Sequence, residues 1–260
     1  MNDLNNQNKN HIEHIFSEIT KNGLYDDPSL CTDNVLAIYD KCLLFVEEQC
    51  KGRDKSHGTE HMVTVTSKAL CIFNELQDTG EKLTHTDLIN VVIGAMLHDV
   101  ADHKYDIGGT LSERDKTFIK TLRSDGVYIN IWTIINTLSF SKEKKAGGYK
   151  GLQQKYMIGF PVYIHRVRSI ISDADRLEAI GRTGVERCIE YTMEMNPGVP
   201  LTQLQANVLE HAQEKLYRLP FPWPDMNGYS FFHTIPGIRM AAELHGDTEK
   251  YVKEYLELAE

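Results

Sequence analysis

The spacing of apolar residues constrains the fold of this chain more than any other feature. Over residues 35–46, 63–76 and 162–171, apolar side chains recur every three to four positions. Because an α-helix has 3.6 residues per turn, this spacing places the apolar side chains on one helix face. An alternating strand pattern around a tight turn is not found, since Asp125-Gly126 is flanked by helical spacing. The chain is therefore predicted to be all-α, with about nine or more helices.

Helix starts and loops can be placed from local signals. Capping-box spacing occurs at Thr84–Asp87, Ser112–Asp115 and Thr202–Gln205, and the first of these precedes the apolar run Leu88–Leu97. Two stretches, about 141–160 and about 218–230, lack helical spacing and are predicted to be long irregular loops. Loops of that length in a compact domain are often functional.

The composition and net charge of the chain limit the kinds of molecule that it is expected to bind. The chain has 260 residues, of which 41% are hydrophobic, and a formal net charge of −9, as expected for one large or two small globular domains. An acidic protein is poorly suited to duplex nucleic acid, whose affinity comes mainly from Lys and Arg on phosphates. A small phosphorylated ligand is compatible with this charge, because it needs only a local positive patch or a metal ion.

Localisation is inferred from three features. The longest apolar stretches reach about seven residues, far below the ~20 of a membrane helix, and no secretion signal is recognised at the start. The five cysteines form no CxxC pair, which favours free thiols in a reducing compartment. We therefore expect a cytoplasmic protein that does not bind membranes.

Polar residues that suit a metal ion occur where the core would otherwise continue. His98-Asp99 closes the apolar run 88–97, Asp173 and Asp175 follow the apolar positions 170–171, and His61 lies at a predicted helix start. Burying an unpaired carboxylate costs several kcal/mol, so such groups are usually paired or bind a metal. Two imidazoles and two carboxylates suit a borderline divalent ion with open positions, although spacing alone leaves their convergence open.

In this order and on an all-α chain, these residues resemble the HD superfamily of metal-dependent phosphohydrolases. More narrowly, the chain is similar to the bacterial-type members that act on nucleoside triphosphates, over roughly residues 35–260. The motifs that carry the resemblance are Ser56-His57 with His61, Leu97-His98-Asp99-Val100-Ala101-Asp102 with Lys104, Ser139-Phe140-Ser141, Asp173-Ala174-Asp175-Arg176-Leu177-Glu178-Ala179-Ile180-Gly181, and His211 to Leu216. The string from Asp173 to Gly181 is the most specific of these.

The resemblance implies a single HD-domain helical bundle over residues 31–260, preceded by an N-terminal extension over residues 1–30. It also implies that one divalent ion is held by His61, His98, Asp99 and Asp175. Manganese is preferred, with Mg, Fe, Ni, Co or Zn as alternatives. A homodimer is compatible with this assignment.

Catalytic roles fall to three residues near the implied ligands. Asp102 is placed to accept a proton from the attacking water, or it caps the helix end. His57 would contact phosphate or cap the next helix, and Lys104 would hold phosphate. His57 is followed by Gly58, where members of the subgroup often have Asp, so any contribution of that Asp is absent or supplied elsewhere.

Substrate binding is assigned to further cations. Arg176 would contact phosphate, or form an ion pair with Glu178 or Asp173. The Lys/Gly-rich insertion at about 141–160 would close over the ligand as a lid, or remain a solvated loop. The cations assigned to substrate binding are Lys104, Arg176, Lys142, Lys145 and Lys215.

The predicted reaction is hydrolysis of a nucleoside triphosphate to monophosphate and pyrophosphate by metal-activated water. The same ligands would also serve a nucleoside monophosphatase, a phosphodiesterase or a non-catalytic nucleotide-binding regulator. A di-iron HD oxygenase needs two further His ligands between His98-Asp99 and Asp175. Only His103 and His165 lie in that segment; His103 is too close to His98-Asp99 to be an independent ligand, and His165 is predicted to be a core histidine.

Overall fold

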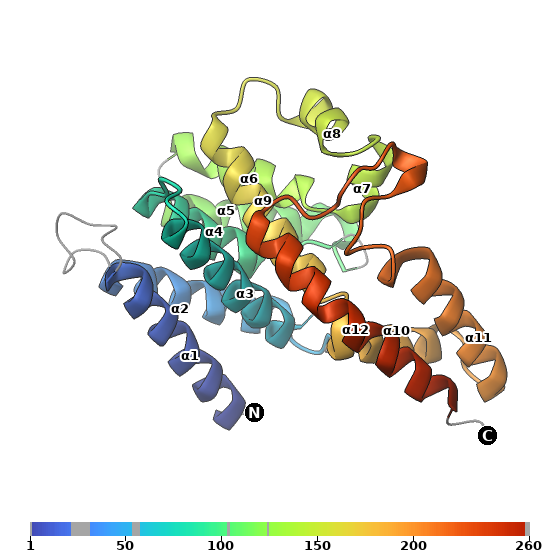
Figure 1. The fold of residues 1–260 in the computed structure, drawn as a ribbon. Coiled ribbons are helices and arrows are strands. Elements are labelled where there is room, and N and C mark those ends of the chain that lie inside the picture. The colour runs from blue at the N-terminus through green and yellow to red at the C-terminus, as the bar shows by residue number, and fades with distance from the viewer. Residues whose placement is uncertain (1, 22–31, 54–57, 103–104, 124, 258–260) are drawn as a thin grey trace. The chain divides into compact units, whose positions relative to one another are not determined.

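The computed structural model describes residues 2–21, 32–53, 58–102, 105–123 and 125–257 (Figure 1). Within these ranges the regular structure is helical, and one isolated bridge between Trp223 and Tyr229 is the strand-like pairing. The all-α prediction is therefore confirmed. The chain divides into two compact units, Met1–Ala174 and Asp175–Glu260.

The first unit contains nine α-helices and the short 3-10 helix Ile107–Gly109 in the part of the chain that the structure describes, and the last α-helix continues into the second unit. The α-helices are α1 (Asn2–Lys21), α2 (Thr32–Gln49), α3 (Thr59–Asp78), α4 (His85–Leu97), α5 (Thr110–Leu122), α6 (Asp125–Thr137), α7 (Phe140–Lys145), α8 (Tyr149–Tyr156) and α9 (Val162–Leu177).

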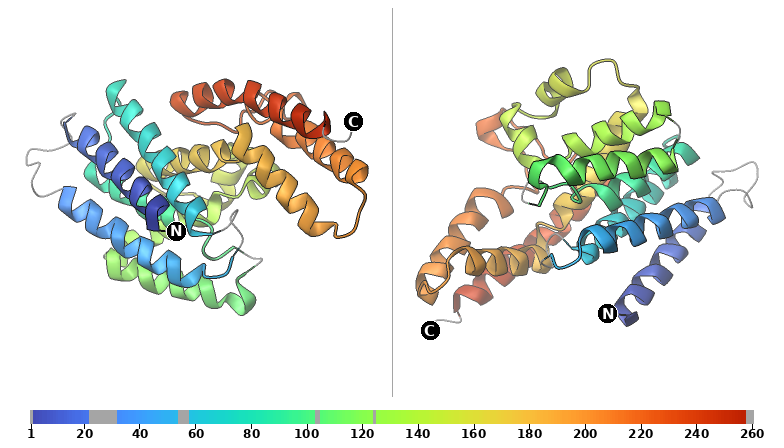
Figure 2. Two further views of the ribbon diagram at one scale, coloured as in Figure 1. Left: turned by 90° about the horizontal axis from the view of Figure 1, so that it is seen from below. Right: turned by 180° about the vertical axis from the view of Figure 1, so that it is seen from behind.

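Helix α4 is the centre of the first unit. Every residue from Asp87 to Leu97 is buried, and α4 packs against α2, α3 and α6 (Figure 2). Its start is fixed by a capping box, in which the Thr84 side chain accepts the Asp87 backbone N–H and the Asp87 carboxylate accepts that of Thr84. A helix that is apolar on all sides needs neighbours on all sides. The run 88–97 therefore organises the core.

Helix α1 belongs to this core. Ile12, Ile15, Phe16 and Ile19 are buried, and the helix lies against α3 in both figures. Burying such side chains contributes about 1.5–3 kcal/mol each.

Two predicted helix starts were wrong. Helix α5 begins at Thr110, so Ser112 lies inside it, and helix α11 (Leu201–His211) begins after Pro200, so Thr202 is its second residue. At α5 the capping group is instead Asp106, whose carboxylate accepts the backbone N–H groups of Leu111 and Ser112.

The insertion at 141–160 is also helical rather than irregular, because it forms α7 and α8. Gly148, at φ +101°, makes the turn between them, and a Cβ on Gly151 would lie 1.9 Å from the Ala146 carbonyl oxygen. The buried Arg168 on α9 donates to Glu143 and, at 2.7 Å, to the carbonyl of Thr137. This buried ion pair ties the insertion to α9, and a lid motion of the whole insertion would break it.

The second unit is built around α10 (Gly181–Met195), α11 and α12 (Ile235–Glu257). A π-helical turn follows α11 over Ala212–Leu216, and a short 3-10 helix spans Pro224–Met226. Most of the segment 218–230 is irregular, as predicted. The apolar core joins α10, α11, the π-helical turn and α12, and its buried members are Val185, Cys188, Val208, Ala212, Leu216, Val252 and Tyr255.

No helix in the described ranges is both long enough and apolar enough to cross a membrane.

Candidate metal centre

Two histidines from packed helices meet in the first unit. His61 lies in the first turn of α3, and His98 is the residue at which α4 ends. Helices α3 and α4 pack against each other, and both imidazoles are buried. The start of one helix and the end of the next thus bring residues 37 positions apart into contact.

The distances between the two imidazoles and Asp99 fit ligands of one ion. The Nε2 atoms of His61 and His98 lie 3.2 Å apart, and Asp99 Oδ2 lies 3.7 Å from each. Two nitrogen ligands at about 2.1 Å from an ion are separated by about 3.0–3.4 Å for bond angles of about 90–109°. The Asp99 side chain is 28% exposed, so the carboxylate opens the centre toward solvent. These three residues are the group in the described part of the chain whose donor atoms are close enough for a metal ion.

A hydrogen bond fixes which nitrogen of His98 is available. His98 Nδ1 donates to the Ala95 carbonyl at 2.8 Å. In the neutral ring, Nε2 is then unprotonated and its lone pair points at the position between the three donors. A carbonyl partner of this kind is the usual support of a metal-binding histidine.

The backbone that carries Asp99 is held by Arg53, which the sequence analysis missed. Its guanidinium donates to the carbonyls of Asp99 at 3.0 Å and Val100 at 2.6 Å, and it lies 4.2 Å over the ring of Tyr105. Arg53 comes from the turn after α2 and no motif marks it, so only the tertiary structure reveals this contact.

The fourth implied ligand lies in the other unit. Asp175 is on the last turn of α9 and is the first residue of the second unit. Its assignment as a ligand therefore stays a prediction. Within its own unit its charge acts on Lys215: burial lowers the pKa of the ammonium, and the Asp175 charge raises it. Lys215 is thus a half-buried amine within electrostatic range of the predicted ligand.

Arg176, the neighbour of Asp175, is engaged by the protein itself. Its guanidinium donates to the Phe231 carbonyl and lies 3.1 Å from His233 Nε2, with the Phe231 ring 5.5 Å below. These contacts in the second unit hold the segment before α12. A role on phosphate stays a prediction for this residue.

The proposed base follows the metal ligands directly. Asp102 lies in the turn after α4 and is half-buried, and its N–H donates to the Asp99 carbonyl at 3.1 Å. Its own carbonyl accepts from Tyr105 and Asp106. Two consecutive turns therefore keep Asp102 next to Asp99. The other two predicted catalytic residues, His57 and Lys104, lie outside the described residues.

The two insertion lysines are exposed on α7. Lys142 Nζ donates to the Asn136 carbonyl at the end of α6 at 3.0 Å, and Lys145 lies in the last turn of α7. Their assignment to substrate stays a prediction.

His165 is half-buried rather than in the core, and its ring is engaged by side chains of α8. Its Nδ1 lies 2.9 Å from the Tyr149 hydroxyl and 3.0 Å from Gln153 Nε2, both on α8. Burial lowers the pKa of the ring. The other histidine considered for a di-iron site, His103, lies outside the described residues.

A buried carboxyl group without a hydrogen-bond partner among the described residues lies near Arg53. Asp115 on α5 is fully buried, and neither of its oxygens has a hydrogen-bond partner among the described residues. Burial, followed by the charge of Asp106, raises the pKa of Asp115 to about 8, with Arg53 acting in the opposite direction. The capping-box interpretation of this sequence concealed it, because it assigned Asp115 to a helix start.

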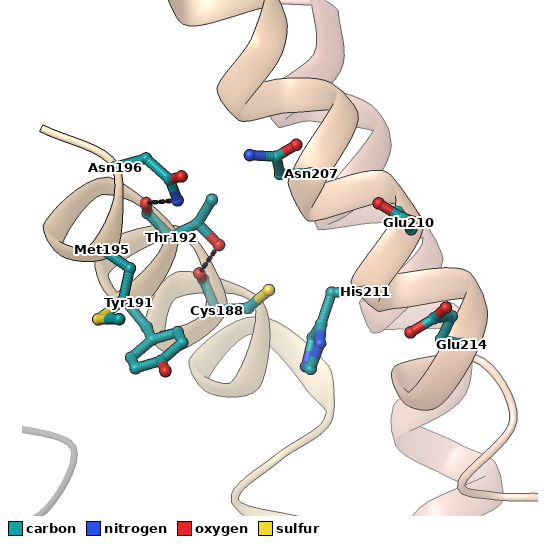
Figure 3. A pocket seen from close by; sticks show the side chains of 9 residues that line it. All are labelled: Cys188, Tyr191, Thr192, Met195, Asn196, Asn207, Glu210, His211 and Glu214. Carbon is teal, nitrogen blue, oxygen red and sulfur yellow. Dashed lines mark hydrogen bonds between the residues drawn. The ribbon is translucent and has the colours of Figure 1, made fainter. Parts of the chain in front are cut away.

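The second unit contains a separate polar cavity of about 270 Å³ between α10 and α11 (Figure 3). Cys188 and Thr192 line it from α10, and Asn207 and His211 line it from α11. Burial raises the pKa of the Cys188 thiol and lowers that of His211.

Comparison of the sequence with known proteins gives a distant relative. No family model matches the chain. The uncharacterized protein L803 of Acanthamoeba polyphaga mimivirus is 30% identical over 148 residues, which are 52% of this chain and 53% of that protein. The chain thus spans about half the length of this relative.

Solved structures match over most of the chain. YpgQ of Bacillus subtilis, crystallised with ADP, is 20% identical with a TM-score of 0.57 over 85% of this chain and 94% of its own. A Lactobacillus plantarum protein is 20% identical with a TM-score of 0.57 over 84% and 95%. An HD-superfamily hydrolase of Bacillus thuringiensis is 18% identical with a TM-score of 0.56 over 86% and 97%. The chain therefore has the helical fold of HD-domain proteins.

Proposed function

We propose that this protein is a metal-dependent phosphohydrolase that cleaves a nucleoside triphosphate to a monophosphate and pyrophosphate. The observation that carries the proposal is the His61, His98 and Asp99 cluster, whose donor atoms are 3.2–3.7 Å apart in an HD-type fold. The ADP bound to YpgQ, which shares this fold, supports a nucleotide as the ligand.

Two imidazoles and a carboxylate suit Mn²⁺ and also Fe²⁺, Co²⁺, Ni²⁺ or Zn²⁺, while Mg²⁺ favours oxygen ligands. We assign His61, His98 and Asp99 as ligands, with Asp175 as the fourth. When bound, such an ion supplies Lewis acidity toward a phosphoryl oxygen and acidifies water.

The residues of the chain then have distinct roles. Water attacks the α-phosphorus, a new P–O bond forms, the bond from that phosphorus to the α–β bridging oxygen breaks, and pyrophosphate leaves. Asp102 accepts the proton of the attacking water. Arg53 and the Ala95 carbonyl keep Asp99 and His98 in place before substrate arrives.

Cations would neutralise the charge of the triphosphate. His57 precedes the ligand His61 in sequence and Lys104 follows Asp99, Arg176 is the neighbour of Asp175, Lys215 is within range of the Asp175 charge, and Lys142 and Lys145 belong to the insertion. Positive groups aimed at phosphoryl oxygens stabilise the charge that develops in the transition state.

A panel of metals and nucleotides tests the proposal, with pyrophosphate and phosphate detected separately. We expect pyrophosphate release with Mn²⁺, and its loss by at least a hundredfold in Asp99→Ala. The matched control is Asp247→Ala, which removes an exposed carboxylate from α12. Turnover by Asp99→Ala at the wild-type rate, or no product from any nucleotide, would refute the proposal. Phosphate released from monophosphates alone would show a monophosphatase, and nucleotide binding without turnover would show a regulator.

A cytoplasmic location follows from the same proposal. The four described cysteines, Cys42, Cys50, Cys71 and Cys188, are free thiols. Free buried thiols are typical of a reducing compartment, where nucleotides are also available.

A further inference from the structure

A cavity of about 400 Å³ lies beside the loop that carries Asp99. Its walls come from the end of α2, the turn after it, the loop after α4 and the start of α5. The residues that matter here are Gln49, Lys51, Arg53, Tyr105, Thr110 and Arg114. The volume is in the range of small-molecule sites, about 300–1,000 Å³.

The cavity is positively charged in an acidic protein. Lys51, Arg53 and Arg114 line it, and no acid is among the lining residues that the structure describes. Two carboxyl groups lie near the cavity without lining it. Asp106 caps α5, and burial raises the pKa of the fully buried Asp115 to about 8, which favours its neutral form at pH 7.

Two of the cations are held in place by the protein. Arg53 is fixed by two backbone carbonyls and the Tyr105 ring, and Arg114 Nη1 donates to Gln49 Oε1 at 2.9 Å. Preorganised arginines match the geometry of phosphate oxygens and lose little entropy on binding. Thr110 adds a hydroxyl at the wall.

We propose that this cavity is a binding site for a phosphate-class polyanion such as pyrophosphate. A net charge of −9 repels polyanions at long range, so three cations gathered in one hollow are a local exception. Arg53 joins the cavity to the metal centre, because the same side chain lines one and holds the Asp99 carbonyl of the other. The site goes beyond the proposed hydrolysis, since binding here requires neither metal nor turnover.

Calorimetric titration of pyrophosphate into the full-length protein in EDTA tests the site. Wild type should bind, and Lys51→Ala/Arg114→Ala should weaken binding at least tenfold. The matched control, Arg239→Ala/Lys250→Ala, removes one exposed Arg and one exposed Lys from α12 and should change the affinity less than twofold. Circular dichroism verifies the fold of each variant, and Lys51→Gln, a single exposed change, should weaken binding severalfold on its own.

Absence of pyrophosphate binding to the wild type, or equal weakening in the control variant, would overturn the proposal. So would unchanged affinity in both cavity variants. None of these outcomes depends on whether the protein hydrolyses nucleotides.

Kinetics with Mn²⁺ then distinguish the source of the anion. If the cavity holds the end of a substrate, the cavity variant raises KM for triphosphates more than for monophosphates. If it holds a free anion, KM is unchanged and inhibition by added pyrophosphate is lost. Both results require the site, and they differ in what fills it.

Discussion

Replacing Asp115 by Asn tests the electrostatics beneath the metal-ligand loop. The carboxyl is fully buried, its oxygens have no hydrogen-bond partner among the described residues, and burial raises its pKa to about 8. In the unfolded chain the pKa of Asp is about 3.9. Asp115→Asn keeps the shape and removes the titration.

The sign of the effect follows from the direction of the shift. Because the folded pKa lies above the unfolded one, the folded state retains a proton that the unfolded state releases between about pH 4 and pH 8. Stability contributed by neutral Asp115 is therefore complete at low pH and is lost as the pH rises through this window. The slope is about 1.4 kcal/mol per pH unit, or about 2.8 kcal/mol between pH 5 and pH 7.

Urea unfolding followed by circular dichroism at pH 5, 6 and 7, in EDTA, measures this difference. The free energy of unfolding of Asp115→Asn minus that of wild type should increase by about 2–3 kcal/mol over the range. Asp247→Asn, an exposed change on α12, should give a constant difference. A constant difference for Asp115→Asn would show that the carboxyl is ionised in the folded protein, and the reasoning would fail.

Three further substitutions have defined outcomes. Arg53→Met frees the Asp99 backbone and should raise the Kd for Mn²⁺ about tenfold by calorimetry; an unchanged Kd would remove Arg53 from the support of the centre. Arg168→Met leaves Glu143 buried without its partner and should cost about 3–5 kcal/mol in urea unfolding, whereas a cost below 1 kcal/mol would contradict a buried pair. Gly151→Ala places a Cβ against the Ala146 carbonyl and should lower Tm by several degrees; a Tm equal to wild type would show that the turn relaxes freely.

The spacing of apolar residues predicted the all-α fold class and the buried core residues more reliably than it predicted where helices begin. The start and the core position of helix α4 could be predicted from the sequence, because Thr84 and Asp87 form a local box and nearly every following position, with the exception of Asn90, is apolar. At α5 the same spacing at Ser112 predicted the wrong helix start, because the capping side chain is that of Asp106, which lies outside the four-residue box. A local pattern predicts only contacts that its own residues make.

The candidate site likewise combines residues that the sequence could predict with contacts that depend on tertiary packing. His61 and His98 could be chosen from sequence because each lies at the edge of an apolar helix, but their 3.2 Å approach depends on how α3 packs on α4. Arg53 and Arg114 carried no signal, since a cation at the end of a helix or in a turn is common. The insertion was predicted to be irregular because α7 and α8 have few apolar residues, and their contacts with α9 are largely polar, among them the buried pair of Glu143 with Arg168 and the contacts of Tyr149 and Gln153 with His165.

The end of α4 explains why a metal ligand arises at that position. A helix leaves its last four carbonyls without intrahelical partners, and α4 ends within the core, where water cannot satisfy them. His98 donates to one of these carbonyls, that of Ala95, and the Val100 N–H donates to another, that of Leu97. The hydrogen bond that satisfies the helix end also places the proton of the neutral ring on Nδ1. The Nε2 atom is then unprotonated, and its lone pair points toward His61. The metal-binding form of His98 is therefore set by the same contact that terminates the helix, before any ion is bound.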